Sequence, residues 1–247
     1  AQHRARIAFS IVPPVKGIGV MALEAGNFFS HDLVMLTLAD NLNRPMARIM
    51  KRSFDLVVAS AALFALMPFF WAVSALIRLD GGAAFFAHRR VGEKGREFLC
   101  RKFRTMHVDS EAILKDVLEN NPQAAAEWAR DQKLRNDPRV TAVGAFLRKT
   151  SLDELPQLIN VIRGEMSLVG PRPVTYAEVL RYGEDAEYYL SAKPGITGLW
   201  QVSGRNDTTY MRRVELDAWY VKNWSLWQDI AIMFKTLPAV LLRRGAC

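Results

Sequence analysis

Cysteine is scarce in this chain, and internal repeats and low-complexity tracts are absent. The two cysteines, Cys100 and Cys247, stand far apart, so the sequence contains neither a disulfide framework nor cysteines at metal-ligand spacing. The opening residues AQHRARIAF lack the order of regions found in a secretory signal peptide. We therefore expect the functional groups of this protein to work in a reducing, cytoplasmic environment.

Negative charge is also in short supply. The chain carries 33 Lys and Arg against 25 Asp and Glu, for a formal net charge of +8 and a pI near 9.7. Such a balance favours a phosphate-rich partner: nucleic acid, an anionic membrane surface or a phosphorylated substrate. Because no groove-reading motif and no aromatic–basic RNA signature occurs, we do not expect nucleic acid as a partner.

Charge is absent altogether between Leu56 and Ile77. A helix of this length can cross a hydrocarbon core of about 30 Å, although a buried core helix is the alternative. Pro68 interrupts the segment, and basic residues on both flanks favour the cytoplasmic side for both ends. We therefore predict a re-entrant membrane helix over residues 46–80 that breaks at Met67–Pro68. The basic flanks comprise Arg44, Arg48, Lys51 and Arg52 before the segment and Arg78, His88, Arg89 and Arg90 after it.

Residues 1–45 contain two apolar stretches. RIAFSIVPPV is typical of a buried strand ended by two prolines, and HDLVMLTLADNL is a second apolar segment. Two strands cannot bury a core by themselves. We interpret residues 1–45 as the C-terminal remnant of a preceding α/β domain.

The remainder of the chain mixes strand and helix patterns. Residues 85–106 alternate around a turn at Gly92–Gly95, which predicts a β-hairpin. A helical period with a break at Pro122 follows, and amphipathic and aromatic helices close the chain. The pattern predicts an α+β fold with a small β element. Trp219, Trp224 and Trp227 suit the core for the most part, with an interfacial position plausible for Trp224 and Trp227.

Asp153 and Glu154 stand side by side in TSLDELP. The spacing from Ser151 to Glu154 is that of a helix capping box, which is the structural alternative. Pro156 would then lie past the first turn, where it conflicts with the helical hydrogen bonds. Adjacent carboxylates repel each other, and a divalent cation such as Mg²⁺ binds one or two carboxylates together with phosphate oxygens.

Basic side chains are close to this pair in the sequence or are held by prolines. Lys102 and Arg104 are two residues apart, so on a strand they share one face. Arg148 just precedes the pair, and Arg172 lies between Pro171 and Pro173. Each alone is more often a solvated surface charge. Together with the carboxylates, they indicate phosphoryl transfer at a lipid interface.

Four motifs resemble one protein family. They are KFRTM, DPRVTAVGAFLRKTSLDELPQLINVIRGEMSLVGPRP, KPGITGLWQVSGRN and DAWYVKNWSLWQDIAIMFKT. The chain resembles the bacterial sugar transferases, the monotopic phosphoglycosyl transferases, over roughly residues 44–247. The family's Ser-Pro break is Met67-Pro68 here, so the polar contact of a serine is missing. The resemblance implies that residues 81–247 form a catalytic domain at the cytoplasmic face of the bacterial inner membrane.

The resemblance implies a reaction. A UDP-sugar gives its sugar 1-phosphate, galactose 1-phosphate first among the candidates, to undecaprenyl phosphate and releases UMP. This step initiates the assembly of O-antigen, capsule or exopolysaccharide. Asp153 is expected as the nucleophile that forms a phosphosugar-aspartyl intermediate, and Glu154 as the ligand of Mg²⁺.

The resemblance also implies a set of binding residues. Phosphate and nucleotide groups are expected at Lys102, Arg104, Arg148, Arg172, Pro173, Gln201, Arg205 and Asp217. The last three are the weakest of these predictions, because turn residues surround them.

Three alternatives stay open at this point. The same reaction can act on glucose or an N-acetylated sugar. The lipid phosphate can attack directly, with Asp153 only as a base or ligand. A membrane-tethered protein that binds anions without turnover is a different class. A homodimer is also a candidate state, because a preceding N-terminal part can supply dimer contacts.

Overall fold

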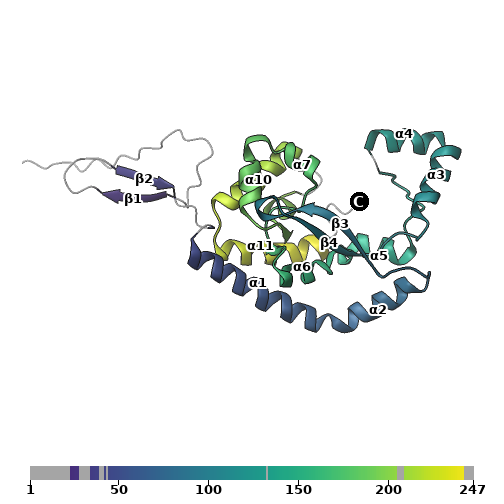
Figure 1. The fold of residues 1–247 in the computed structure, drawn as a ribbon, viewed down its shortest axis with the longest axis horizontal. Helices are drawn as coiled ribbons and strands as arrows, with labels where there is room; N and C mark the ends of the chain where they lie inside the picture. Colours follow the sequence, from purple (N-terminus) through teal and green to yellow (C-terminus); the bar gives the residue numbers. More distant parts are fainter. Residues whose placement is uncertain are drawn as a thin grey trace, which may run out of the picture.

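The computed structural model describes residues 23–27, 34–38, 42, 44–131, 133–204 and 209–241. Within them, the chain forms helices and three separate two-stranded sheets, which confirms the mixed α+β class. Figure 1 shows one helical body above a long bent helix pair, with a small sheet set apart from it.

The detached sheet consists of strands β1 (Leu23–Asn27) and β2 (Val34–Leu38), which pair antiparallel. In Figure 1 they lie beyond the start of α1, away from the helical body. The strand expected in RIAFSIVPPV lies outside the described residues. The assignment of residues 1–45 to a preceding α/β domain therefore stays a prediction.

Helices α1 (Pro45–Ala65) and α2 (Met67–Arg78) form the bent pair. Within the described residues, each helix alone falls short of the length and apolarity needed to cross a membrane, whereas the pair together reaches them with a bend of 60°. Pro68 occupies the first turn of α2, where its missing N–H costs no helical hydrogen bond. The break lies at Leu66, next to the predicted Met67–Pro68, which begin α2.

Strands β3 (Phe85–Val91) and β4 (Glu97–Phe103) form the predicted antiparallel hairpin. The short 3₁₀ helix η3 (Glu93–Gly95) makes its turn, and Lys94 and Gly95 both adopt positive φ there. Phe86 pairs with Lys102 across the hairpin. Because β4 ends at Phe103, Lys102 is still on the pleated strand, whereas Arg104 is beyond it.

After the hairpin, helices α3 (Ser110–Asn120) and α4 (Pro122–Asp131) form an arm that stands off from the body (Figure 1). The break at Pro122 is confirmed. The chain returns to the body through a bridge between Met106 and Val140 and enters α5 (Ala142–Thr150).

The body is built around a buried parallel pair, β5 (Ser167–Val169) and β6 (Gly195–Thr197). Its principal core cluster includes Val161, Met166, Val169 and Tyr220. Helices and 3₁₀ turns pack around the pair. These are η4 (Leu152–Glu154), α6 (Gln157–Arg163), α7 (Tyr176–Leu180), η5 (Gly183–Asp185), α8 (Ala186–Ser191), α9 (Leu199–Val202), α10 (Tyr210–Lys222) and α11 (Leu226–Leu241).

Helix α1 is fixed to this body by a buried charged group that we call the Lys51 cluster: Lys51, Tyr220, Trp224 and Asp229. Lys51 Nζ lies 2.7 Å from Asp229 Oδ2 and also donates to the Val169 carbonyl at 3.1 Å. Tyr220 and Trp224 donate to the same carboxylate at 2.7 and 3.0 Å. The bent pair is thereby tied to the end of β5, from which the Arg172 loop departs.

Candidate active site

The two adjacent carboxylates lie on a tight turn between α5 and α6. Ser151 ends α5 in the left-handed region, with φ 55°, and η4 then carries Asp153 and Glu154. The Ser151 side chain makes no capping hydrogen bond, so the capping-box alternative is wrong. Pro156 occupies the N-cap position of α6, where it interrupts no helical hydrogen bond.

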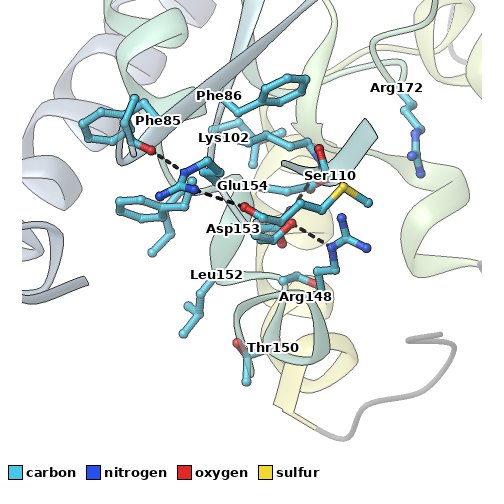
Figure 2. A pocket seen from close by; sticks show the side chains of 18 of the residues that line it. Phe85, Phe86, Lys102, Ser110, Arg148, Thr150, Leu152, Asp153, Glu154 and Arg172 are labelled. Atoms are coloured by element: carbon cyan, nitrogen blue, oxygen red, sulfur yellow. Dashed lines mark hydrogen bonds and ion pairs between the residues drawn. The ribbon is translucent and has the colours of Figure 1, made fainter. Parts of the chain in front are cut away.

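Lys102 of β4 faces both carboxylates (Figure 2). Its Nζ lies 2.6 Å from Glu154 Oε1 and 3.5 Å from Asp153 Oδ2. One ammonium group therefore partly neutralises two acids that sequence adjacency forces together. Burial and the neighbouring Glu154 charge raise the pKa of Asp153, whereas Lys102 and Arg148 act in the opposite direction.

The pKa of Lys102 responds to the same pair. Burial alone would lower it, but the negative charges of Glu154 and Asp153 outweigh that effect and raise it. Lys102 thus stays a cation in this environment. A fixed positive charge next to two carboxylates is suited to holding the oxygens of a phosphate group.

Arg148 approaches from α5. Gly144 makes this approach possible, because a Cβ there would lie 2.0 Å from the Thr105 carbonyl oxygen. The close contact between α5 and the end of the hairpin lets Arg148 Nε donate to Thr105 Oγ1 at 2.8 Å. Figure 2 shows Arg148 beside Asp153, with Arg172 across the pocket from them.

Arg172 is carried by the loop that follows β5. The Gly170 N–H donates to the Thr197 carbonyl at 2.9 Å, and Gly195 donates to the Pro171 carbonyl at 2.8 Å. A Cβ on Gly170 would lie 2.4 Å from the Lys193 carbonyl oxygen, so only glycine fits this crossing. The loop is therefore held in place just before Arg172, whose guanidinium lies 5.6 Å from the Trp200 ring.

These side chains surround one cavity of about 930 Å³. Its walls come from the β3–β4 hairpin, η4, the Arg172 loop, α9 and α11 (Figure 2). Lys102, Arg148, Arg172, Asp153 and Glu154 all line it. The volume is that of a site for a sizeable organic ligand. A narrow extension beside Cys100 reaches Pro173 and Gln157.

Two predicted residues lie at the cavity with other partners. Arg104 donates to the carbonyls of Ala83 at 2.6 Å and Ile77 at 2.9 Å and forms an ion pair with Asp80. It ties the hairpin to the end of α2, and its guanidinium is turned away from the carboxylate pair. Gln201 lines the cavity and donates to the Ile196 carbonyl at 3.3 Å.

The last two predicted residues are placed differently. Arg205 lies outside the described residues. Asp217 is buried within α10 and accepts a hydrogen bond from the Tyr182 hydroxyl at 3.0 Å. Burial raises the pKa of Asp217 to about 7, against the effects of Tyr182, Arg213 and Arg172. Asp217 is not among the residues that line the cavity.

Some cavity residues were not predicted. Phe85 and Phe86 on the exposed hairpin strand, and Trp200 and Thr236 on α9 and α11, all line it. Trp200 stands next to Gln201 in the motif GLWQVSG, which was the available signal. Thr236 belongs to an apolar helix, and nothing in its local sequence marks it.

The donor set suits a magnesium ion held jointly with a substrate. Across the described part of the chain, no group of three or more His, Cys, Asp or Glu side chains could hold a metal by itself. Mg²⁺ is usually bound by one or two carboxylates together with substrate phosphates. Asp153 and Glu154 supply such carboxylates at the cavity wall, so the residues fit this ion.

Comparison with known proteins identifies the family of this chain. The family model described as bacterial sugar transferase matches residues 46–243. The chain belongs to the bacterial sugar transferase family. The matched residues include the bent helix pair and every described wall of the cavity.

Three curated relatives illustrate the similarity. The chain is 53% identical to a UDP-galactose-lipid carrier transferase of Erwinia amylovora, over 100% of its own length and 51% of the relative. It is 50% identical to an undecaprenyl-phosphate galactose phosphotransferase of Salmonella typhimurium, over 100% of its own length and 52% of the relative. It is 54% identical to an exopolysaccharide production protein of Sinorhizobium fredii, over 82% of its own length and 90% of the relative. The chain therefore spans about half the length of the first two relatives.

Proposed function

We propose that this family member is a phosphoglycosyl transferase that moves galactose 1-phosphate from UDP-galactose to undecaprenyl phosphate and releases UMP. The observation that carries the proposal is the position of Asp153: half-buried at the cavity, with Lys102 and Arg148 beside it and Arg172 opposite. The names of two relatives support galactose as the sugar and undecaprenyl phosphate as one acceptor. Glucose and N-acetylated sugars are the alternatives.

The reaction divides into two displacements. In the first, a carboxylate oxygen of Asp153 attacks the phosphorus that bears the sugar, and the bond from that phosphorus to the bridging oxygen breaks. UMP leaves with the bridging oxygen and the electron pair. In the second, an oxygen of the lipid phosphate attacks the same phosphorus and the aspartyl bond breaks, which restores the carboxylate. Neither step requires a proton from the protein.

The cations of the site have separate parts in this scheme. Lys102 holds Glu154 at 2.6 Å and is close enough to Asp153 to keep it oriented toward the cavity. Arg148 and Arg172 lie on opposite sides, so a diphosphate placed between them meets positive charge at both ends. Mg²⁺, held by Glu154, would neutralise part of the diphosphate charge.

The bent helix pair supports a position at the membrane. Its faces expose large apolar side chains, among them Phe64, Trp71 and Leu79 with 77, 75 and 83% of their surface accessible. With basic residues at both ends, we infer that the pair enters the bilayer from the cytoplasmic face and returns to it. The cavity then opens where a nucleotide sugar from the cytoplasm and a lipid phosphate can both reach it, at the bacterial inner membrane.

The proposal is tested by measuring UMP release from a panel of UDP-sugars. The full-length protein is placed in nanodiscs with Mg²⁺ and a short polyprenyl phosphate. We expect release with UDP-galactose and much less with UDP-glucose or UDP-N-acetyl sugars. Release with another sugar alone would change the assignment of the substrate. No release with any sugar would contradict the proposal that the protein is a phosphoglycosyl transferase. Light scattering of the same sample reports whether the predicted homodimer forms.

A further inference from the structure

A row of alternating arginines and aromatic rings extends from the cavity across α9 and α10. We call it the arginine ladder, and it consists of Arg172, Trp200, Arg213, Tyr210 and Arg181. Arg172 and Arg213 lie 5.6 and 4.6 Å from the Trp200 ring. Arg213 and Arg181 lie 5.7 and 3.9 Å from the Tyr210 ring. Its inner end, Arg172 and Trp200, lines the cavity, so the ladder begins in the active site.

Packing alone does not account for this row, because its arginines lack acidic partners. Elsewhere in the body, Arg90, Arg101, Arg104 and Arg139 each lie within ion-pair distance of a carboxylate. Among the described residues, no such pair forms at Arg172, Arg181 or Arg213. In addition, Nε and one terminal nitrogen of Arg213 are buried without a hydrogen-bond acceptor. A guanidinium with buried, unmet donors is poorly stabilised until an acceptor arrives.

The charges of Arg172 and Arg213, which both lie near the Trp200 ring, also act on each other, and Trp200 is only 6% exposed. The carboxylates nearby offset this repulsion only in part. Glu178 is paired with Arg90, and Asp217 is buried and accepts from Tyr182. Glu154 acts on Arg172 from the cavity side but is bonded to Lys102. An anion that reaches both guanidiniums would relieve their repulsion and meet the free donors of Arg213.

We propose that Arg172 and Arg213 form a subsite for the phosphate of the departing nucleoside monophosphate. The inference rests on the proposed function. When the bond to the bridging oxygen breaks, the nucleotide phosphate gains one negative charge. Forked guanidinium donors bind a phosphate dianion strongly and in a fixed orientation. Arg172 lines the cavity, and Arg213 lies near the same Trp200 ring, so the two guanidiniums hold the group beside that ring.

The test is calorimetric titration of the protein in nanodiscs with UMP, uridine and inorganic phosphate, without lipid acceptor. Arg213→Gln removes the charge, and Arg212→Gln is the matched control. Arg212 is the adjacent residue, and its ion pair with Glu215 has more than half of both side chains exposed. We expect R213Q to weaken UMP binding by about tenfold or more, the size of a lost charge-assisted hydrogen bond. Uridine binding should not change, and R212Q should bind UMP within about twofold of the wild type, since its ion pair is a surface one.

Equal UMP affinity in R213Q and wild type would overturn the subsite, as would equal affinity of the wild type for UMP and uridine. If R213Q does not fold, Arg213→Lys decides in the same assay. It keeps the charge but loses the fork, and we expect it to bind UMP at least about threefold more weakly. Wild-type affinity in R213K would then overturn the assignment. UMP binding is measured without turnover, so the two proposals can fail separately. If the protein binds UMP through Arg213 but releases no UMP from any UDP-sugar, the subsite stands and only the proposed function is contradicted.

Discussion

Two lysine–carboxylate clusters in this protein have similar chemistry and opposite surroundings. In the Lys51 cluster, Asp229 accepts from Lys51, Tyr220 and Trp224, and its side chain is 1% exposed. In the cluster of Lys102 with Asp153 and Glu154, the lysine side chain is 34% exposed and all three line the cavity. The first has its polar groups satisfied by the protein. The second keeps oxygens and charge available for a ligand.

The difference shows that the number of fixed donors and access to the cavity distinguish a structural carboxylate from one that can react. Asp229 has three donors fixed around it and lies at the junction of α1, β5 and α11, where it can only hold these elements together. Asp153 has one cation at 3.5 Å and an open cavity in front of it. Substitutions in the two clusters should therefore separate loss of stability from loss of activity.

The largest effect on activity is expected for Asp153→Asn. The amide keeps the shape of the side chain but cannot attack phosphorus, so UMP release should fall by more than about 10³-fold. The melting temperature should stay within a few degrees of the wild type, because the side chain borders a cavity. Wild-type turnover in this variant would show that Asp153 is not the nucleophile.

The largest effect on stability is expected for Lys51→Met. It leaves the Asp229 charge buried without its cation, which should lower the free energy of unfolding by about 3–5 kcal/mol. Chemical unfolding followed by tryptophan fluorescence measures this. The double variant Lys51→Met with Asp229→Asn should recover only part of the loss, since the Asp229 charge is gone but the buried Asp55 still lacks the cation that acts on it. A single variant as stable as the wild type would show that the cluster does not hold α1 in place.

Lys102→Met tests whether the cluster at the cavity serves activity rather than stability. The variant loses the cation that holds Glu154 and orients Asp153, and loss of one preorganised charged contact at a reaction centre typically costs about 10²–10³ in rate. The unfolding free energy should change by only about 1 kcal/mol, because the ion pair is partly solvated. UMP release and unfolding of the same preparation check both numbers. If K102M instead lost as much stability as K51M and kept the wild-type rate, the Lys102 cluster would serve stability rather than activity.

The smallest effect concerns Asp217 and pH. Its pKa is raised from 3.8 to about 7 in the folded state, so folding favours the protonated acid. The stabilising contribution is complete below pH 4 and is lost as the pH rises through about 7. Asp217→Asn removes this titration. Melting temperatures at pH 5.5 and 8 should therefore differ less in the variant than in the wild type, and an equal difference would show that Asp217 does not titrate in this range.

Local patterns predicted much of this fold. Alternation around Gly92 predicted the hairpin, and Pro68 inside an uncharged segment predicted the nearby bend between α1 and α2. The conflict between a capping box and Pro156 pointed to the carboxylate pair. Each of these rests on residues within about one turn or one strand of each other, where sequence spacing fixes geometry.

Long-range contacts could not be predicted in the same way. Lys102 and Arg104 would share a face only if the strand continued, but β4 ends at Phe103 and Arg104 turns to the end of α2. The interfacial position considered for Trp224 is wrong, because its indole is buried and bonded to Asp229. Trp227 is 80% exposed. Which helix covers which residue depends on packing between distant segments, and that is not encoded in any single stretch.

Intact-protein and peptide mass spectrometry after incubation with UDP-galactose and no lipid acceptor can detect a covalent phosphosugar on Asp153. We expect a hexose-phosphate adduct on the peptide that contains Asp153, released when a polyprenyl phosphate is added. UMP formation that requires the lipid, with no adduct at any time, would rule out the aspartyl intermediate and favour direct attack by the lipid phosphate.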